Sequence, residues 1–163
     1  MKKKLIGIII AGIIVSLSIV MYNWLFPAEF KVRDDEIALR IKLDLNEDIG
    51  LVVFDYNLDG HDFSGGISNA DRTMIKRDDE LVQVWDKEIL KHDLGKEITS
   101  DNYPFQITFR IITEYVEPNF ENVYPEEITK YLESIEWTAY FGQEYHFTIT
   151  GNNTDGYTVE LAE

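Results

Sequence analysis

Regular alternation of apolar and polar residues is the feature that most restricts the fold of this chain. Residues 37–45 place Ile or Leu at every second position, with Ala, Arg, Lys and Asp between them. Successive side chains of a β-strand point to opposite faces, so this period predicts a strand with one buried face. The same period recurs in residues 105–111, 145–149 and 157–161. The chain is therefore expected to be mainly β.

Turn signals predict how the strands connect. Asn46, Glu47 and Asp48 separate the first strand from an apolar run, which predicts a hairpin of these two strands. A connection rich in Gly, Asn and Asp, residues 151–156, predicts a second hairpin near the end of the chain. The expected strands cover residues 37–45, 49–56, 105–116 with a bulge at Ile111 and Ile112, 137–141, 145–149 and 157–161.

Two short helices are expected between the strands. Residues 85–94 end in Lys91 and His92 with Gly95 after them, which is typical of a helix C-terminus. Residues 125–134 begin with a proline and two glutamates, which suits the first turn of a helix. Together these patterns predict a small antiparallel β-sandwich with immunoglobulin-like layers and one or two short helices. A small barrel is the alternative.

The start of the chain has a different character. Lys2, Lys3 and Lys4 precede residues 5–21, which hold no charge, and the uncharged stretch continues to Ala28. At about 1.5 Å per residue, a helix over residues 5–26 would extend roughly 33 Å, enough to cross a hydrocarbon core. The lysines predict that the N-terminus stays cytoplasmic. We therefore expect an N-terminal transmembrane helix before the sandwich.

A cleaved signal peptide is the competing interpretation of this segment. Its cleavage site requires small residues, and Phe26 and Pro27 precede the nearby Ala28, so retention is favoured. The expected domains are residues 1–28 as cytoplasmic lysines and anchor, 29–35 as a short juxtamembrane linker, and 36–163 as an acidic domain outside the cytoplasm. The expected location is the cell membrane, crossed once.

The charge of the chain excludes one class of partner. Residues from 29 onward hold all 30 acidic residues and all but three of the 15 basic ones, so this part carries a formal charge of −18. Nucleic-acid binding needs a basic surface, and we expect none here. The chain has no Cys, which excludes disulfides, thiolate metal sites and a cysteine nucleophile.

One stretch resembles the start of a calcium-binding loop. Residues 55–60 read Asp-Tyr-Asn-Leu-Asp-Gly, with oxygen donors at alternate positions and a glycine for the bend. The twelfth position is Gly66, where an EF-hand has a bidentate Glu, so an EF-hand is excluded. A different calcium loop and a simple polar turn both remain open. The calcium candidates are Asp55, Asn57, Asp59 and Asp62.

Two further groups of residues have features of a functional site. Ser64 precedes Gly65 and Gly66, but the nucleophile elbow of serine hydrolases is missing, so a turn in a loop is expected there. Aromatic and acidic residues interleave in residues 114–131. Exposed rings there would form a patch for a partner, whereas buried rings would cover one end of the core. The candidates for this aromatic patch are Tyr115, Phe120 and Tyr124.

No catalytic set emerges from these patterns. We expect a protein that is not an enzyme and that has a binding or structural role in the cell envelope, with a protein partner there. A calcium-dependent ligand-binding module built on residues 55–62 is the alternative, and a small hydrolase is less favoured.

Overall fold

A computed structural model describes Met21, residues 30–116 and residues 124–162. The chain divides into two units, Met1–Lys31 and Val32–Glu163, and the second unit contains every strand described below. The predicted membrane segment lies, apart from Met21, outside the described residues. Among the residues that the structure describes, none of the helices has the length and hydropathy of a membrane-spanning segment.

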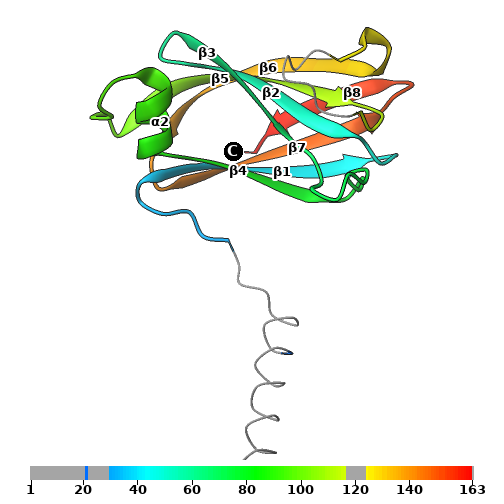
Figure 1. Cartoon of the computed structure of the whole chain (residues 1–163), viewed down its shortest axis with the longest axis horizontal. Helices are drawn as coiled ribbons and strands as arrows, with labels where there is room; N and C mark the ends of the chain where they lie inside the picture. The colour runs from blue at the N-terminus through cyan, green and yellow to red at the C-terminus, as the bar shows by residue number, and fades with distance from the viewer. Residues whose placement is uncertain (1–20, 22–29, 117–123, 163) are drawn as a thin grey trace, which may run out of the picture. The chain divides into compact units, whose positions relative to one another are not determined.

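Eight strands form two four-stranded sheets that pack face to face (Figure 1). One sheet has the order β4-β1-β7-β8 and the other β3-β2-β5-β6. The elements are β1 (Glu36–Leu45), β2 (Leu51–Leu58), β3 (His61–Ile67), β4 (Glu80–Asp86), α2 (Lys87–Leu94), β5 (Asn102–Ile112), the 3₁₀ turn η1 (Glu126–Ile128), β6 (Thr129–Tyr140), β7 (Gln143–Asn152) and β8 (Gly156–Leu161). The expectation of two packed β layers with a short helix is confirmed.

The hydrophobic core lies between the sheets and is rich in aromatic rings. Tyr56 packs against Trp85 with ring centroids 5.1 Å apart, and Phe105 stacks on Trp137 at 5.2 Å. β6 also lies alongside β8, so the two sheets approach each other at these edges. The opposite edges of the sheets are β3 and β4.

The first predicted hairpin is wrong. β1 lies between β4 and β7 in one sheet, whereas β2 belongs to the other. The turn after β1 carries the chain across the sandwich, and Ile49 pairs with Ile75 instead. The purely antiparallel arrangement is also wrong, because β1 pairs with β7 in parallel, with Leu39 opposite Tyr145. Alternation reveals which face of β1 is buried, but it carries no information about the neighbouring strand.

The predicted helix over residues 125–134 is also wrong. Only η1 is helical, and β6 begins at Thr129. β6 pairs with β5, and this pairing lets Ile135, Trp137 and Ala139 turn toward the core. The acidic residues Glu126 and Glu127 favour a helical turn. After that one turn, pairing with β5 outweighs the local helix preference, and the chain continues as a strand.

Other local predictions are confirmed or shifted. The β7–β8 hairpin forms as expected, with Ile149 opposite Val159. The helix before Gly95 forms from Lys87, and Gly95 ends it with a φ of 62°. The bulge is displaced from the predicted position and lies between Thr108 and Arg110 in the β5–β6 pairing.

The consecutive apolar residues Ile111 and Ile112 at the end of β5 do not mark a bulge, as the sequence predicted, but two buried faces. Ile111 belongs to the main core between the sheets, whereas Ile112 packs with Leu51 and Val53 in a second cluster. Two consecutive strand residues point to opposite faces, so both faces of β5 are apolar at this end.

Candidate functional site

The β2–β3 hairpin places the candidate calcium residues. Asp59 and Gly60 form its two-residue turn, with φ values of 53° and 81°. Positive φ at both central residues is typical of the two-residue hairpin turn whose twist matches that of the flanking strands. Asp55 and Asn57 alternate with the buried Phe54 and Tyr56, so they point to the outer face of the sheet.

Asn57 ties the tip of this hairpin together. Its side-chain oxygen accepts a hydrogen bond from the backbone N–H of Gly60 at 3.1 Å. Its amide nitrogen donates to Asp62 on the neighbouring strand at 2.7 Å. The asparagine therefore uses both ends of its amide to hold the turn.

The other two carboxylates bind different partners. Arg110 Nη2 on β5 donates to Asp55 Oδ1 at 2.8 Å, and Arg110 Nε lies 2.7 Å from Asp55 Oδ2. Asp59 pairs with Lys96 of the connection after α2, and this hydrogen bond lowers the pKa of Asp59. Asp55 and Asp59 thus form ion pairs with basic residues from different parts of the chain, β5 and the connection after α2.

The structure brings two of the four calcium candidates, Asn57 and Asp62, into direct contact. Among the described residues, no three His, Cys, Asp or Glu side chains gather as a metal site would require. Asp55 and Asp59 would have to leave their ion pairs to join a common ion. The calcium loop stays a prediction.

The outer face of the β3-β2-β5-β6 sheet is a shallow polar surface. Rows of side chains cross it at matching register positions, with Asn57 opposite both Asp62 and Gln106. Gln106 in turn donates to Glu136 on β6 at 3.0 Å. Two open hollows of about 480 and 450 Å³ flank this row. The first is lined by polar groups that include Asp55, Asn57, Asp62, Ser64, Gln106 and Thr108.

Ser64 is part of this surface and does not lie in a loop. The predicted turn at Ser64, Gly65 and Gly66 is wrong, because all three belong to β3. A Cβ atom on Gly65 would lie 2.5 Å from Cε2 of Phe54. The glycine is therefore needed for close packing of the strand on an aromatic ring.

The predicted aromatic patch is only partly visible. Tyr124 is half-buried and packs with Val116 and Ile128 against the second apolar cluster, and burial raises its pKa. Tyr115 is half-buried as well, and Phe120 lies outside the described residues. The position of Tyr124 agrees with a ring that covers apolar residues, and the patch as a whole stays a prediction.

More exposed rings lie on β6, where the sequence interpretation expected a helix. Tyr131 is 68% exposed, and Tyr140 is 49% exposed. The guanidinium of Arg110 lies 6.0 Å from the centre of the Tyr131 ring, so this tyrosine adjoins the Asp55 ion pair. The alternation of Ile135, Trp137 and Ala139 could have indicated that Tyr140 faces outward. Tyr131 is exposed because the irregular pairing opposite Thr108 and Arg110 shifts the alternation of β6, so that Leu132 is buried instead.

The outer face of the other sheet carries a charged network that sequence reasoning missed. Arg40 Nε donates to Glu144 at 2.6 Å, and a second guanidinium nitrogen pairs with Glu80. The hydrogen bond from Arg40 lowers the pKa of Glu144. His146 Nε2 lies 3.1 Å from the same carboxylate. Arg40 meets Glu144 and His146 because β1 and β7 pair in parallel, and it meets Glu80 because β1 also pairs with β4.

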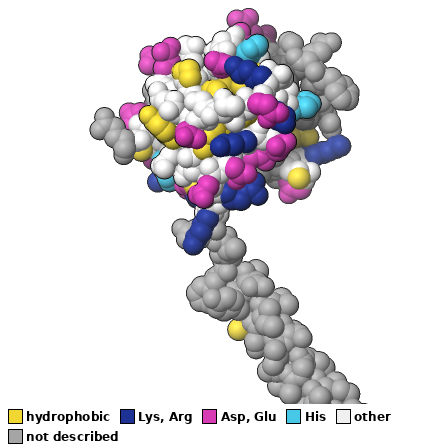
Figure 2. Space-filling view, turned by 90° about the vertical axis from the view of Figure 1, so that its left-hand side faces the viewer, with side chains coloured by type: hydrophobic (Ala, Val, Ile, Leu, Met, Phe, Trp, Pro, Cys, Tyr) yellow, Lys and Arg dark blue, Asp and Glu magenta, His cyan; other side chains and the backbone are white. Residues whose placement is uncertain are grey.

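The end of the domain that carries α2 has charges of both signs (Figure 2). A hollow of about 530 Å³ there is lined by Lys91, His92, Lys96 and the acids Glu88 and Glu97. Lys91 and Glu97 pair at 2.7 Å. Because acidic and basic side chains both line this hollow, its lining does not favour a ligand of either charge.

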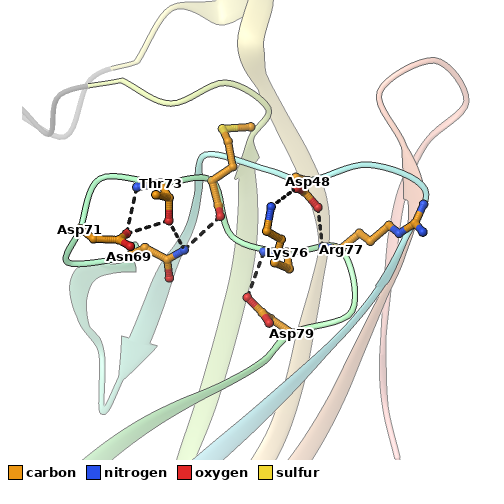
Figure 3. Close-up of polar contacts among 8 residues, drawn as sticks. Asp48, Asn69, Asp71, Thr73, Lys76, Arg77 and Asp79 are labelled. Carbon is orange, nitrogen blue, oxygen red and sulfur yellow. Dashed lines mark hydrogen bonds and ion pairs between the residues drawn. The ribbon is translucent and has the colours of Figure 1, made fainter.

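The connection between β3 and β4 is ordered by side-chain hydrogen bonds (Figure 3). Asn69 donates to the Thr73 hydroxyl at 3.1 Å and to a backbone carbonyl at 3.0 Å. Asp48 accepts from Lys76 Nζ at 2.7 Å and from the Arg77 backbone N–H at 3.1 Å. The segment that follows β3 is thereby fixed to the turn after β1.

Comparison with known proteins gives no family. No family model and no curated protein matches the sequence. The fold is similar at a low level to pneumolysin solved at 1.98 Å, with a TM-score of 0.36 and 9% identity over 78% of this chain and 23% of that one. The membrane-binding domain of pneumolysin gives 0.34 and 10%, covering 78% of this chain and 96% of that one. The chain thus spans less than a quarter of the first of these proteins.

Proposed function

We propose that this chain is a membrane-anchored protein whose acidic β-sandwich lies outside the cytoplasm and binds a partner in the cell envelope, without a catalytic role. Three lysines, an uncharged segment and a domain of charge −18 support the anchor and its orientation. The domain follows the anchor after a short linker, so it would be held near the membrane surface.

The observation that carries the binding role is the ordered outer face of the β3-β2-β5-β6 sheet. Its polar side chains are held in place by contacts between strands, such as Asp55 with Arg110 and Gln106 with Glu136. A surface that is already fixed loses little side-chain entropy when a partner covers it. Its hollows are open and shallow, which suits recognition of a surface or an extended ligand.

A calcium-dependent module remains the second candidate. Its support is that Asn57 and Asp62 lie side by side at one hairpin tip, where rotation of the Asn57 amide would bring its oxygen next to the Asp62 carboxylate.

The absence of Cys allows a clean test of the anchor and its orientation. One cysteine replaces Glu160, an exposed residue of β8, and in a second variant one replaces Lys3. In intact cells a membrane-impermeant maleimide should label Glu160→Cys, and Lys3→Cys only after permeabilisation. Recovery of the unlabelled full-length chain from cytosol without detergent would contradict the proposal.

A further inference from the structure

β3 forms one edge of its sheet. It pairs with β2 on one side, and within the described residues no strand lies on its other side. None of its seven residues is buried. The outer edge of this strand therefore presents backbone groups to the surroundings.

The tight turn determines which backbone groups face outward. Leu58 and His61 flank the two-residue turn, so they form a hydrogen-bonded pair, and such pairs alternate along an antiparallel ladder. By this alternation Phe63 and Gly65 bond to β2. The N–H and C=O groups of Asp62, Ser64 and Gly66 then point away from β2, toward the free edge.

Apart from the charge of Asp62, this edge lacks the usual protection against added strands. Exposed edges are commonly guarded by lysine, proline or a bulge. β3 contains neither lysine nor proline, and its register with β2 is continuous from His61 to Ile67. Gly66 has no side chain that could obstruct an approaching backbone.

Hydrogen bonds also hold the turn before this edge and the connection after it in place. Asn57 ties the turn that precedes β3, through Gly60 and Asp62. The connection that follows is fastened by Asp48, which binds Lys76 and the backbone of Arg77 (Figure 3). A strand could therefore be added without first ordering the edge, which lowers the entropic cost of binding.

Side chains and charge define the strand that would fit. Phe63 and Ile67 are partly exposed at the rim of the core, so an added strand would gain by placing apolar side chains beside them. On the opposite face the exposed Asp62 favours a basic side chain. The charge of −18 after residue 28 disfavours a second copy of this chain as the occupant.

We propose that the β3 edge binds an extended segment of a partner protein, with apolar and basic residues in alternation, as an added strand. This inference rests on the proposed function only in assuming that the domain binds a partner. It concerns the edge and would fail separately from the anchor.

The test uses the full chain in a mild detergent and a fluorescent peptide of alternating Val and Lys. Binding is followed by fluorescence anisotropy. A peptide of alternating Val and Glu, and a Val/Lys peptide N-methylated at the residues that face β3, serve as controls. We expect the unmodified Val/Lys peptide to bind at least tenfold more tightly than either control.

A pair of variants at one position separates backbone from side-chain effects. Ser64→Pro removes an outward N–H and should weaken binding at least tenfold, whereas Ser64→Ala should bind like the parent chain. Hydrogen exchange of the parent chain adds a measurement that needs no variant. Bound peptide should slow exchange at Asp62, Ser64 and Gly66.

Several results would overturn the proposal. These are absence of binding, equal binding by either control peptide, unchanged affinity of a folded Ser64→Pro chain, and protection of β4 in place of β3. Self-association that Ser64→Pro abolishes would instead identify a second copy as the occupant and overturn the choice of partner.

Discussion

The indole Nε1 of Trp85 donates a buried hydrogen bond to the hydroxyl of Tyr56 at 3.1 Å. Trp85 lies on β4 of one sheet and Tyr56 on β2 of the other, so this bond joins the two layers. The surrounding aromatic rings exclude water, and burial raises the pKa of Tyr56. This polar contact thus joins the two sheets within an apolar core.

Tyr56→Phe should destabilise the domain by about 1–3 kcal/mol, because it leaves the buried indole N–H without a partner. Urea unfolding of the full chain, followed by circular dichroism, measures this loss. Tyr131→Phe removes the same hydroxyl from an exposed ring and should change stability by less than about 0.5 kcal/mol. Equal effects of the two variants would show that the buried bond is not important.

Gly65→Ala should destabilise the domain by about 1–3 kcal/mol, because the new methyl group would overlap the Phe54 ring. Gly66→Ala is the matched control, since its Cβ would meet its nearest neighbour at 3.4 Å. Adding Phe54→Leu to Gly65→Ala should cost less than the sum of the two single changes. Strict additivity, measured by the same unfolding curves, would count against steric conflict.

Acid should weaken the outer network of the β4-β1-β7-β8 sheet. The hydrogen bond from Arg40 lowers the pKa of Glu144, so this contact stabilises the fold above the unfolded pKa of a glutamate, about 4.3. That stabilisation is lost as the pH falls through the folded value. Unfolding at pH 7, 5 and 3 should therefore show a smaller acid-dependent loss for Glu144→Gln than for the parent chain. Glu160→Gln, on an exposed residue of β8, should follow the parent.

Calcium tests the second candidate function. Arg110 holds Asp55 and Lys96 holds Asp59, so millimolar Ca²⁺ should leave the Tm of the full chain unchanged. A ligand that binds only the folded state raises stability by mass action, so a rise in Tm would reveal binding. If such a rise disappears in Asp55→Ala with Asp59→Ala, the calcium-dependent module is the better interpretation.

The sequence alone determined the local structure of this protein wherever neighbours along the chain decide it. The alternation in 37–45 shows which face of β1 is buried, and Gly95 ends α2, because both depend on side chains a few residues apart. The glycine-rich connection before Tyr157 likewise produced the expected β7–β8 hairpin. The spacing of Asp55 and Asn57 also placed them correctly on one side of the chain.

Tertiary structure decided which strands became neighbours. The strand expected over residues 49–56 forms as β2, residues 51–58, in a different sheet from β1. Residues 129–134 became strand because they pair with β5. The ion pair of Asp55 with Arg110 and the contact of Arg40 with Glu144 follow from that pairing. Each joins residues more than fifty positions apart. Local propensity carries no information about such partners, because their contact depends on the order of strands in the finished sheets.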